Sequence, residues 1–301
     1  MTSEMPAATS ADADDHLHAT ARRLRGLVEP LAAAVYFAPE AQQRYEALGL
    51  NYFEGYFCSR SASLGAAPWR LVSGSFAAFK PAIVERAVTG GWSKTTPDAL
   101  LDARLAGARE QYARMIGEPD ATTSADMLAA AAVLLEVADG LDMSGRPLFA
   151  GLAGLPVPGE DDPLGRLWRA ADLVREHRGD GHIAAWISHV DATEITVLTE
   201  LWWGIEPGSY VWTRGWDGDD VAAARTRLAE RGLLDGDGDG GLTDLGRDLR
   251  EQIERATDRA ERVIVERLGD RADDLFTQLA PWSGALVGDG GYPANVSAMF
   301  G

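Results

Sequence analysis

Residues 233–246, LLDGDGDGGLTDLG, place three aspartates at alternate positions between two amphipathic segments. A calcium-binding EF-hand loop that started at Asp235 would use Asp237 and Asp239 as its next two ligands. Position 12, where a carboxylate must close the cage, is Gly246. Asp-Gly pairs also supply the positive φ angles of tight β-hairpin turns. The sequence therefore favours a hairpin between two helices over a metal loop.

The segments around this turn follow a defined order. Three helical patterns precede a helix that ends in RGLL, and then come the glycine-rich turn, LT..GR.L and a long amphipathic helix. This order resembles the winged helix-turn-helix of MarR-like regulators over about residues 190–260. The matching residues are Leu228, Arg231, Gly232, Leu233, Leu234, Leu242, Thr243, Gly246, Arg247 and Leu249. The resemblance implies a recognition helix over 219–231, a two-stranded wing at the aspartates, and a homodimer formed through the terminal helices.

The whole chain also resembles an actinobacterial family of two-part helix-turn-helix proteins. The segments EPLAAAVYF, YFEGYF and REHRGDGH, followed by TRGW and the expected wing, carry this second resemblance. That family has no settled activity, so the resemblance implies an architecture and no particular reaction.

Helical periodicity along most of the chain predicts a mainly α fold, in which a helical N-terminal domain is followed by a winged helix-turn-helix domain with a small β-hairpin wing. Residues 1–20 lack apolar periodicity and are expected to form a disordered tail. The Pro- and Gly-rich segment 151–163 is the expected linker. The helical N-terminal domain then covers 21–150, with Pro30 interrupting its first helix, and the MarR-like domain with its C-terminal helix covers 164–301.

Charge argues against strong nucleic-acid binding. The net charge is −18, with 13 basic against 18 acidic residues in 1–150 and 15 against 28 in 151–301. Residues 217–241 hold three arginines against seven acids, so the expected recognition segment is itself acidic. A field of that sign repels phosphates. DNA is therefore a possible partner that the charge disfavours, and contacts with it are expected from Thr213, Arg214, Arg225, Arg227 and Arg231.

The segment REHRGDGH and its surroundings hold three of the five histidines, His177, His182 and His189. A metal site would need these side chains on converging faces, and no cysteine or clearly placed carboxylate completes a ligand set. The favoured interpretation is a corner between two helices, in which the first helix ends at Gly179, Asp180 caps the second, and Arg178 pairs with Asp180. This corner is also the first choice for a ligand contact.

Aromatic side chains are dense in NYFEGYF and in the tryptophan-rich stretch around residues 202–216. Such groups usually fill a core, but buried tryptophans need partners for their indole N–H, so some are expected to line an apolar pocket. The expected ligand-binding residues are Tyr56, Arg178, Asp180, His182 and Trp186, and the expected ligand is a small apolar or aromatic molecule. The single cysteine, Cys58, is expected to be a buried structural thiol, which excludes an internal disulfide.

Several classes of protein find no support in the residues. We find no P-loop, no nucleotide-binding glycine pattern and no serine nucleophile elbow, so no cofactor and no metal is expected. No run of about 18 apolar residues is evident, and the polar, acidic N-terminus does not resemble a signal peptide. We therefore expect a cytoplasmic protein without a membrane span.

Two hypotheses follow. The first is a MarR-like transcriptional regulator that binds DNA and responds to a small, largely apolar ligand. The second is a winged-helix scaffold that has lost DNA binding and binds a ligand or catalyses a reaction with Arg178, Asp180 and His182. The order of elements favours the first and the acidic recognition segment favours the second; whether the protein is an enzyme is left open.

Overall fold

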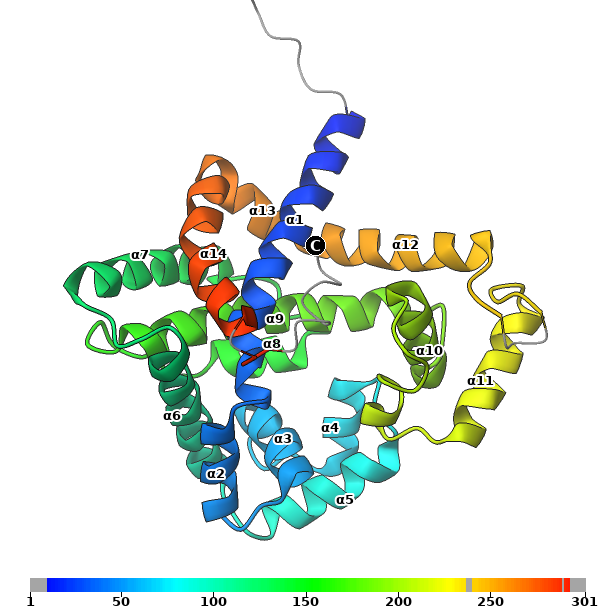
Figure 1. Cartoon of the computed structure of the whole chain (residues 1–301), viewed down its shortest axis with the longest axis horizontal. Helices are drawn as coiled ribbons and strands as arrows, with labels where there is room; N and C mark the ends of the chain where they lie inside the picture. The colour runs from blue at the N-terminus through cyan, green and yellow to red at the C-terminus, as the bar shows by residue number, and fades with distance from the viewer. Residues whose placement is uncertain (1–9, 237–239, 289, 293–301) are drawn as a thin grey trace, which may run out of the picture.

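The computed structural model describes residues 10–236, 240–288 and 290–292, and this part of the chain is mainly helical (Figure 1). Within these residues the β structure is one antiparallel bridge between Leu234 and Leu242. The prediction of a mainly α fold is confirmed. A two-stranded wing is not seen in the described residues, and the expected wing residues Asp237 and Asp239 lie outside them.

Fourteen α-helices are described. The N-terminal half contains α1 (Ser10–Ala33), α2 (Pro39–Ala47), α3 (Tyr52–Ser61), α4 (Trp69–Phe76), α5 (Pro81–Trp92), α6 (Pro97–Met115), α7 (Ala121–Ala138) and α8 (Pro147–Ala153). The second half contains α9 (Pro163–Trp186), α10 (Ala192–Trp203), α11 (Gly218–Glu230), α12 (Asp244–Ala260), α13 (Arg262–Leu268) and α14 (Ala272–Gly288). Short 3₁₀ turns lie at Ala34–Tyr36, Ala62–Leu64, Trp212–Arg214 and Gly269–Arg271. Proline begins five of the α-helices, because its fixed φ suits the first helical position.

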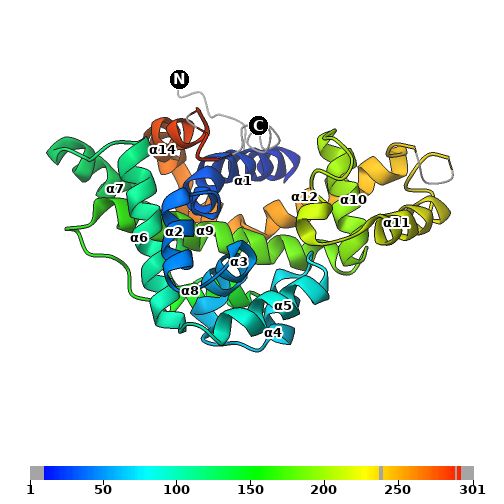
Figure 2. The ribbon, with the colours of Figure 1, turned by 60° about the horizontal axis from the view of Figure 1, so that its bottom comes forward.

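Helix α9 lies in the middle of the molecule and contacts α1, α6, α7, α8 and α12. Figures 1 and 2 show α6 and α7 toward one end of the molecule and α10 and α11 toward the other. One hydrophobic core contains residues from Leu24 to Tyr292, and the indole of Trp168 in this core donates to the Ala32 carbonyl at 3.2 Å. Residues from both expected domains therefore share a single core.

The expected corner at Gly179 is wrong, because α9 continues to Trp186. Glycine inside a helix costs about 1 kcal/mol relative to alanine, a cost that packing easily offsets. The packing is close here: a side-chain carbon at Gly181 would lie 2.8 Å from Nη1 of Arg146. Asp180 does not cap a helix. Its carboxylate lies inside α9 and accepts the backbone N–H of Phe149 at 3.0 Å.

Helix α1 also differs from expectation at both ends. It continues through Pro30, and it begins at Ser10, inside the segment expected to be a tail. Its first turns are held by contacts that are distant in sequence. Leu17 is buried together with Val265, and Nδ1 of His18 lies 3.2 Å from Asp258. The sequence around residue 20 is polar, so these tertiary contacts, and not local periodicity, order the segment.

Helices α10 and α11 pack on each other, and their buried leucines pack with Ile253 of α12 in a core of their own. A capping box of Asp191 and Glu194 begins α10. After α11, Asp235 N–H donates to the Gly241 carbonyl at 2.9 Å, next to the bridge between Leu234 and Leu242. A side-chain carbon at Gly246 would lie 2.2 Å from the Leu233 carbonyl oxygen, which explains the glycine of the LT..GR pattern.

Helix α7 is long and apolar enough to cross a membrane, judged by length and composition alone, so the expectation that no such run exists is wrong. The same length and composition occur in core helices of soluble proteins. In the described structure α7 packs on α9, α13 and α14, and its Met127, Ala131 and Leu134 belong to the main core.

Candidate functional site

A cavity of about 570 Å³ lies between α1, α3, α9, α12 and the connection from α10 to α11. This volume is within the range of about 300–1,000 Å³ that is usual for small-molecule sites. Of the residues expected to bind a ligand, Tyr56, Arg178 and His182 line it. Asp180 is buried toward α8, as described above, and Trp186 is buried in the core that α10, α11 and α12 share.

Arg178 and His182 are positioned by α12, not by Asp180. The guanidinium of Arg178 donates to Asp258 at 2.8 Å, which corrects the predicted pair with Asp180. Nδ1 of His182 lies 3.0 Å from the Thr257 hydroxyl. Burial lowers the pKa of His182 to about 3, so its imidazole is neutral at physiological pH.

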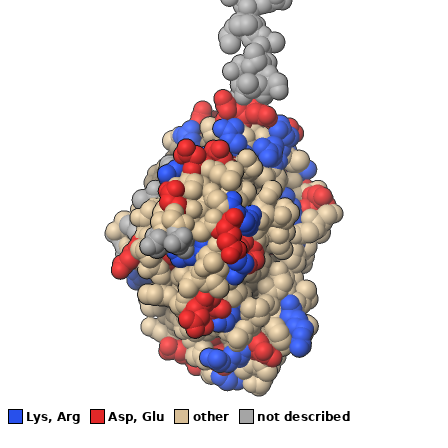
Figure 3. Space-filling view, turned by 90° about the vertical axis from the view of Figure 1, so that its right-hand side faces the viewer, with Lys and Arg blue, Asp and Glu red and all other residues tan. Residues whose placement is uncertain are grey.

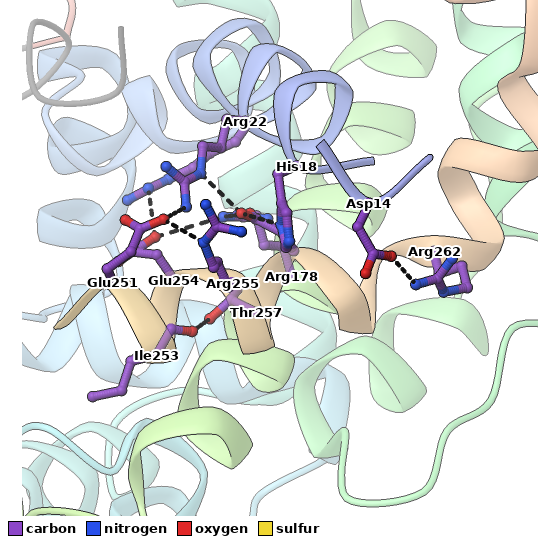
Figure 4. Close-up of polar contacts among 12 residues, drawn as sticks. Asp14, His18, Arg22, Arg178, Glu251, Ile253, Glu254, Arg255, Thr257 and Arg262 are labelled. Atoms are coloured by element: carbon purple, nitrogen blue, oxygen red, sulfur yellow. Dashed lines mark hydrogen bonds and ion pairs between the residues drawn. The ribbon is translucent and has the colours of Figure 1, made fainter. Parts of the chain in front are cut away.

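One wall of the cavity is formed by α1, α9 and α12, and ion pairs connect these three helices. Figure 4 shows His18 and Arg22 of α1 directed toward Arg178 and the acidic face of α12. Asp258 lies 2.8 Å from Nε of Arg22 and is fully buried. Because α1 comes from one end of the sequence and α12 from the other, the cavity exists only in the folded chain and is not a property of either half.

The opposite wall is aromatic. Tyr56 makes edge-to-face contacts with Tyr36, at 5.3 Å between ring centroids, and a tilted contact with Phe79 at 5.8 Å. Its hydroxyl accepts from Nη1 of Arg60 at 3.0 Å, and Arg60 donates on to Glu176. Burial alone would raise the pKa of Tyr56, but the positive charge of Arg60 and of two further arginines outweighs burial and lowers it below its usual value.

The connection between α10 and α11 forms the third wall. The buried carboxylate of Glu200 accepts three backbone N–H groups, from Gly208 at 3.0 Å, Tyr210 at 2.7 Å and Val211 at 2.8 Å. These bonds hold the connection against α10. Glu200 was not among the residues expected from the sequence, although it is the only charged residue between Glu194 and Glu206.

Thr213 and Arg214 were expected from the sequence to contact DNA. In the structure they line the cavity. The Arg214 guanidinium lies over the rings of Tyr210 and Phe79, at 4.1 and 4.8 Å from their centroids. The backbone carbonyl of Arg214 accepts from Lys80 N–H at 2.9 Å, and the Lys80 ammonium lies 2.7 Å from Asp217, the N-cap of α11. Helix α5 is thereby tied to the start of α11.

The remaining three expected DNA-binding residues lie on or next to α11 and have partners within the chain. Arg225 donates to the Gly240 carbonyl at 2.8 Å. Arg227 pairs with Asp191 at 2.6 Å and with Glu194 at 3.1 Å, and Arg231 pairs with Glu194 at 3.2 Å. Figure 3 shows basic and acidic side chains interspersed on the side of the molecule where α11 lies, without a continuous patch of either sign.

The three histidines of the expected cluster have separate surroundings. Nδ1 of His177 lies 2.7 Å from Glu261, His182 contacts Thr257, and His189 is exposed. In the parts of the chain that the structure describes, no group of three or more His, Cys, Asp or Glu side chains is placed to hold a metal ion. Cys58 is fully buried, and burial raises the pKa of its thiol to about 12.

Asp180 gives the first testable prediction. Burial raises its pKa from 3.8 to about 7, so its carboxyl keeps its proton in the folded state over a range in which the unfolded chain loses it. The resulting stability is fully present below pH 3.8 and is lost as the pH rises to 7, a change of about 4 kcal/mol. Asp180→Asn keeps an acceptor for Phe149 N–H and cannot ionise. We expect the variant to unfold at higher urea concentration than the wild type at pH 8, with little gain at pH 4; equal gains at both pH values would contradict this.

Neither a curated protein nor a solved structure matches the chain significantly. A family model described as a helix-turn-helix family matches residues 21–293. This match begins inside α1 and ends beyond α14, so the matched range covers the helices that line the cavity as well as α10 and α11. The chain belongs to this helix-turn-helix family.

Proposed function

We propose that the protein is a cytoplasmic, DNA-binding transcriptional regulator of MarR-like type that responds to a small, largely apolar ligand. The position of the cavity is the observation that carries this proposal. Its wall includes Ser209, Tyr210 and Thr213, from the connection between α10 and α11, the helices that we propose as the helix-turn-helix unit. A ligand in the cavity would contact the segment that sets the position of α11.

The connection between α10 and α11 could adopt two arrangements, one that favours DNA binding and one that does not. A ligand shifts the equilibrium between them only if it binds the two arrangements with unequal affinity. The contacts described above offer a route for this. The connection is fixed to α10 by Glu200 and to α5 through Lys80, which also pairs with the acidic N-terminus of α11. Movement of Arg214 or Tyr210 around a ligand would therefore be transmitted to both the start of α11 and α5.

Contacts with DNA are proposed for Arg225, Arg227 and Arg231. The side chains of Arg227 and Arg231 are 43% and 42% exposed, so a phosphate can reach both. The Arg227–Asp191 pair is exposed on both sides and contributes only about 0–1 kcal/mol, so exchange of Asp191 for a DNA phosphate costs little. Glu194 is buried, so loss of both arginines to DNA would leave its carboxylate without these partners and would oppose binding. The net charge of −18 opposes binding at long range, so we expect weak affinity with a strong dependence on salt.

An electrophoretic mobility shift at about 50 mM salt tests this proposal, with the upstream DNA of the protein's own gene and a random duplex of equal length. We expect retardation of the upstream DNA, weakened by the double variant Arg227→Ala, Arg231→Ala. The salt slope should fall by about one for each phosphate contact that is lost. Arg271→Ala is the matched control, because Arg271 pairs with Glu136 of α7, toward the other end of the molecule.

The second candidate is a ligand-binding or catalytic protein that has lost DNA binding. The pairing of Arg227 and Arg231 with Asp191 and Glu194 favours it, since the basic groups of α11 are already neutralised. Catalysis would rest with Arg178 and His182, because Asp180 points toward α8. Absence of retardation for any duplex at low salt, from a protein that still binds small molecules, would establish this candidate over the first.

The proposal includes a homodimer. The terminal helices expected to pair between copies, α12 to α14, pack within this chain on α1. Light scattering after size exclusion decides the question, because a dimer would have twice the chain mass of 32.2 kDa.

A further inference from the structure

The α9–α12 end of the cavity contains buried hydrogen-bond donors without acceptors. Nη1 of Arg178 and both Nε and Nη1 of Arg250 are buried and make no hydrogen bond. Arg178 is 8% exposed and Arg250 is 1% exposed, and both line the cavity. Buried guanidinium donors are costly when unpaired, so an arrangement of this kind is typical of a site that is completed by a ligand.

The side chains that line the cavity also carry an excess of positive charge. Arg25, Arg178 and Arg250 surround one carboxylate, Glu254, at 3.3, 3.8 and 2.9 Å. Asp258, the other carboxylate near Arg178, is shared with Arg22 and contacts His18. The cavity lining as a whole contains five arginines, Arg25, Arg175, Arg178, Arg214 and Arg250, against three glutamates, Glu29, Glu254 and Glu261.

Other groups at this end do not supply the missing acceptor. The Thr257 hydroxyl donates to the Ile253 carbonyl and contacts Nδ1 of His182. Glu261 is engaged by His177. An oxyanion from outside the chain would satisfy the free donors of Arg178 and Arg250 together, and guanidinium groups bind carboxylates strongly through paired N–H groups.

The other end of the cavity is aromatic and would contact the uncharged part of a ligand. Phe37, Tyr52, Phe53 and Phe79 line it, together with Tyr56. Phe37, Tyr52 and Phe53 are 47%, 46% and 41% exposed. Phe37 contacts Tyr292 and Tyr52 contacts Phe53 edge to face, and these contacts leave part of each ring exposed. Flat apolar surfaces of this type favour stacking and edge contacts with an aromatic body.

We propose that the cavity binds an amphipathic organic anion, whose carboxylate lies at Arg178 and Arg250 and whose aromatic or apolar body lies against the rings of α3 and Phe79. The ligand would be the effector of the proposed regulator, and this role rests on the proposed function. Binding of the anion in the cavity does not depend on that function. Binding itself is measured without DNA, so failure of the ligand proposal and failure of DNA binding give separate results.

The test uses the full chain with 2-naphthoate and its neutral analogue 2-naphthamide, measured by isothermal titration calorimetry. We expect the carboxylate to bind at least about tenfold more tightly than the amide. Arg250→Met should weaken 2-naphthoate by roughly 10- to 100-fold and change 2-naphthamide by less than about threefold. Arg247→Met is the control, because Arg247 lies on the same helix but is 61% exposed.

Arg250→Lys keeps the charge next to Glu254 and guards against a folding defect in Arg250→Met. It should retain part of the preference for the carboxylate. Equal binding of the two compounds by the wild type, or no binding of either at about 1 mM, would overturn the proposal. Loss of the carboxylate preference in Arg214→Met, with Arg250→Met unchanged, would overturn the position assigned to the headgroup.

Discussion

Glu176→Ala is expected to lower the free energy of unfolding by about 3–5 kcal/mol, because it removes the anion from a buried cationic cluster. The Glu176 carboxylate lies 2.9 Å from Arg60 and 2.7 Å from Arg175, and its side chain is 3% exposed. Without it, two buried guanidinium groups lose their main counter-charge. Urea denaturation followed by far-ultraviolet circular dichroism measures the change.

The matched control is Glu110→Ala. Glu110 also pairs with an arginine, Arg44, but its side chain is 48% exposed, so the expected loss is only about 0–1 kcal/mol. A loss of similar size in both variants would show that the Glu176 cluster is solvated and that its burial does not govern its energetics.

Glu176 also contributes to the decline of the unfolding free energy at low pH. Burial alone would raise the pKa of Glu176, but Arg175 and Arg60 outweigh it and hold the pKa at about 2, below the ordinary 4.5. The stability that Glu176 contributes is therefore fully present above pH 4.5 and is lost as the pH falls toward 2. The difference corresponds to about 3 kcal/mol. Glu176→Gln should show a flatter decline of unfolding free energy between pH 4.5 and 2.5 than the wild type.

The elements that the sequence predicted well carry local start and stop patterns. Proline at a first helical position marks α2 and α6, and Asp191 with Glu194 marks α10 through a capping box. The prediction that Gly179 ends a helix failed because tertiary packing along α9 outweighs the local glycine pattern, with Arg146 lying close to Gly181 two residues further on. Local patterns report local free energies of about 1 kcal/mol, whereas several long-range contacts together exceed that.

The candidate site was predictable in part for the same reason. Tyr56, Arg178 and His182 stand out by residue type within apolar or glycine-rich stretches, and all three line the cavity. Arg250 does not stand out, because a charged residue in REQIER is ordinary on an amphipathic helix. Its unpaired donors are visible only once α1, α9 and α12 are packed together.

Glu200→Ala is expected to release the connection between α10 and α11 and to weaken ligand binding in the cavity by at least about tenfold. The variant leaves the N–H groups of Gly208, Tyr210 and Val211 without their acceptor. Hydrogen bonds to a charged group contribute about 1.5–3 kcal/mol each, so together they outweigh the conformational entropy of a short connection. Glu200→Gln should be intermediate, since an amide oxygen can replace only one of the two carboxylate oxygens.

Hydrogen exchange measures this local effect, because opening of the connection raises exchange at residues 204–215 while α9 stays protected. Glu206→Ala is the control: Glu206 lies in the same connection, but it is exposed and accepts Ser209 N–H only through its backbone. If the regulator reads its ligand through this connection, Glu200→Ala should also abolish any effect of 2-naphthoate on DNA retardation. Unchanged exchange at 204–215 in Glu200→Ala would show that packing on the cavity wall, and not the Glu200 carboxylate, holds the connection in place.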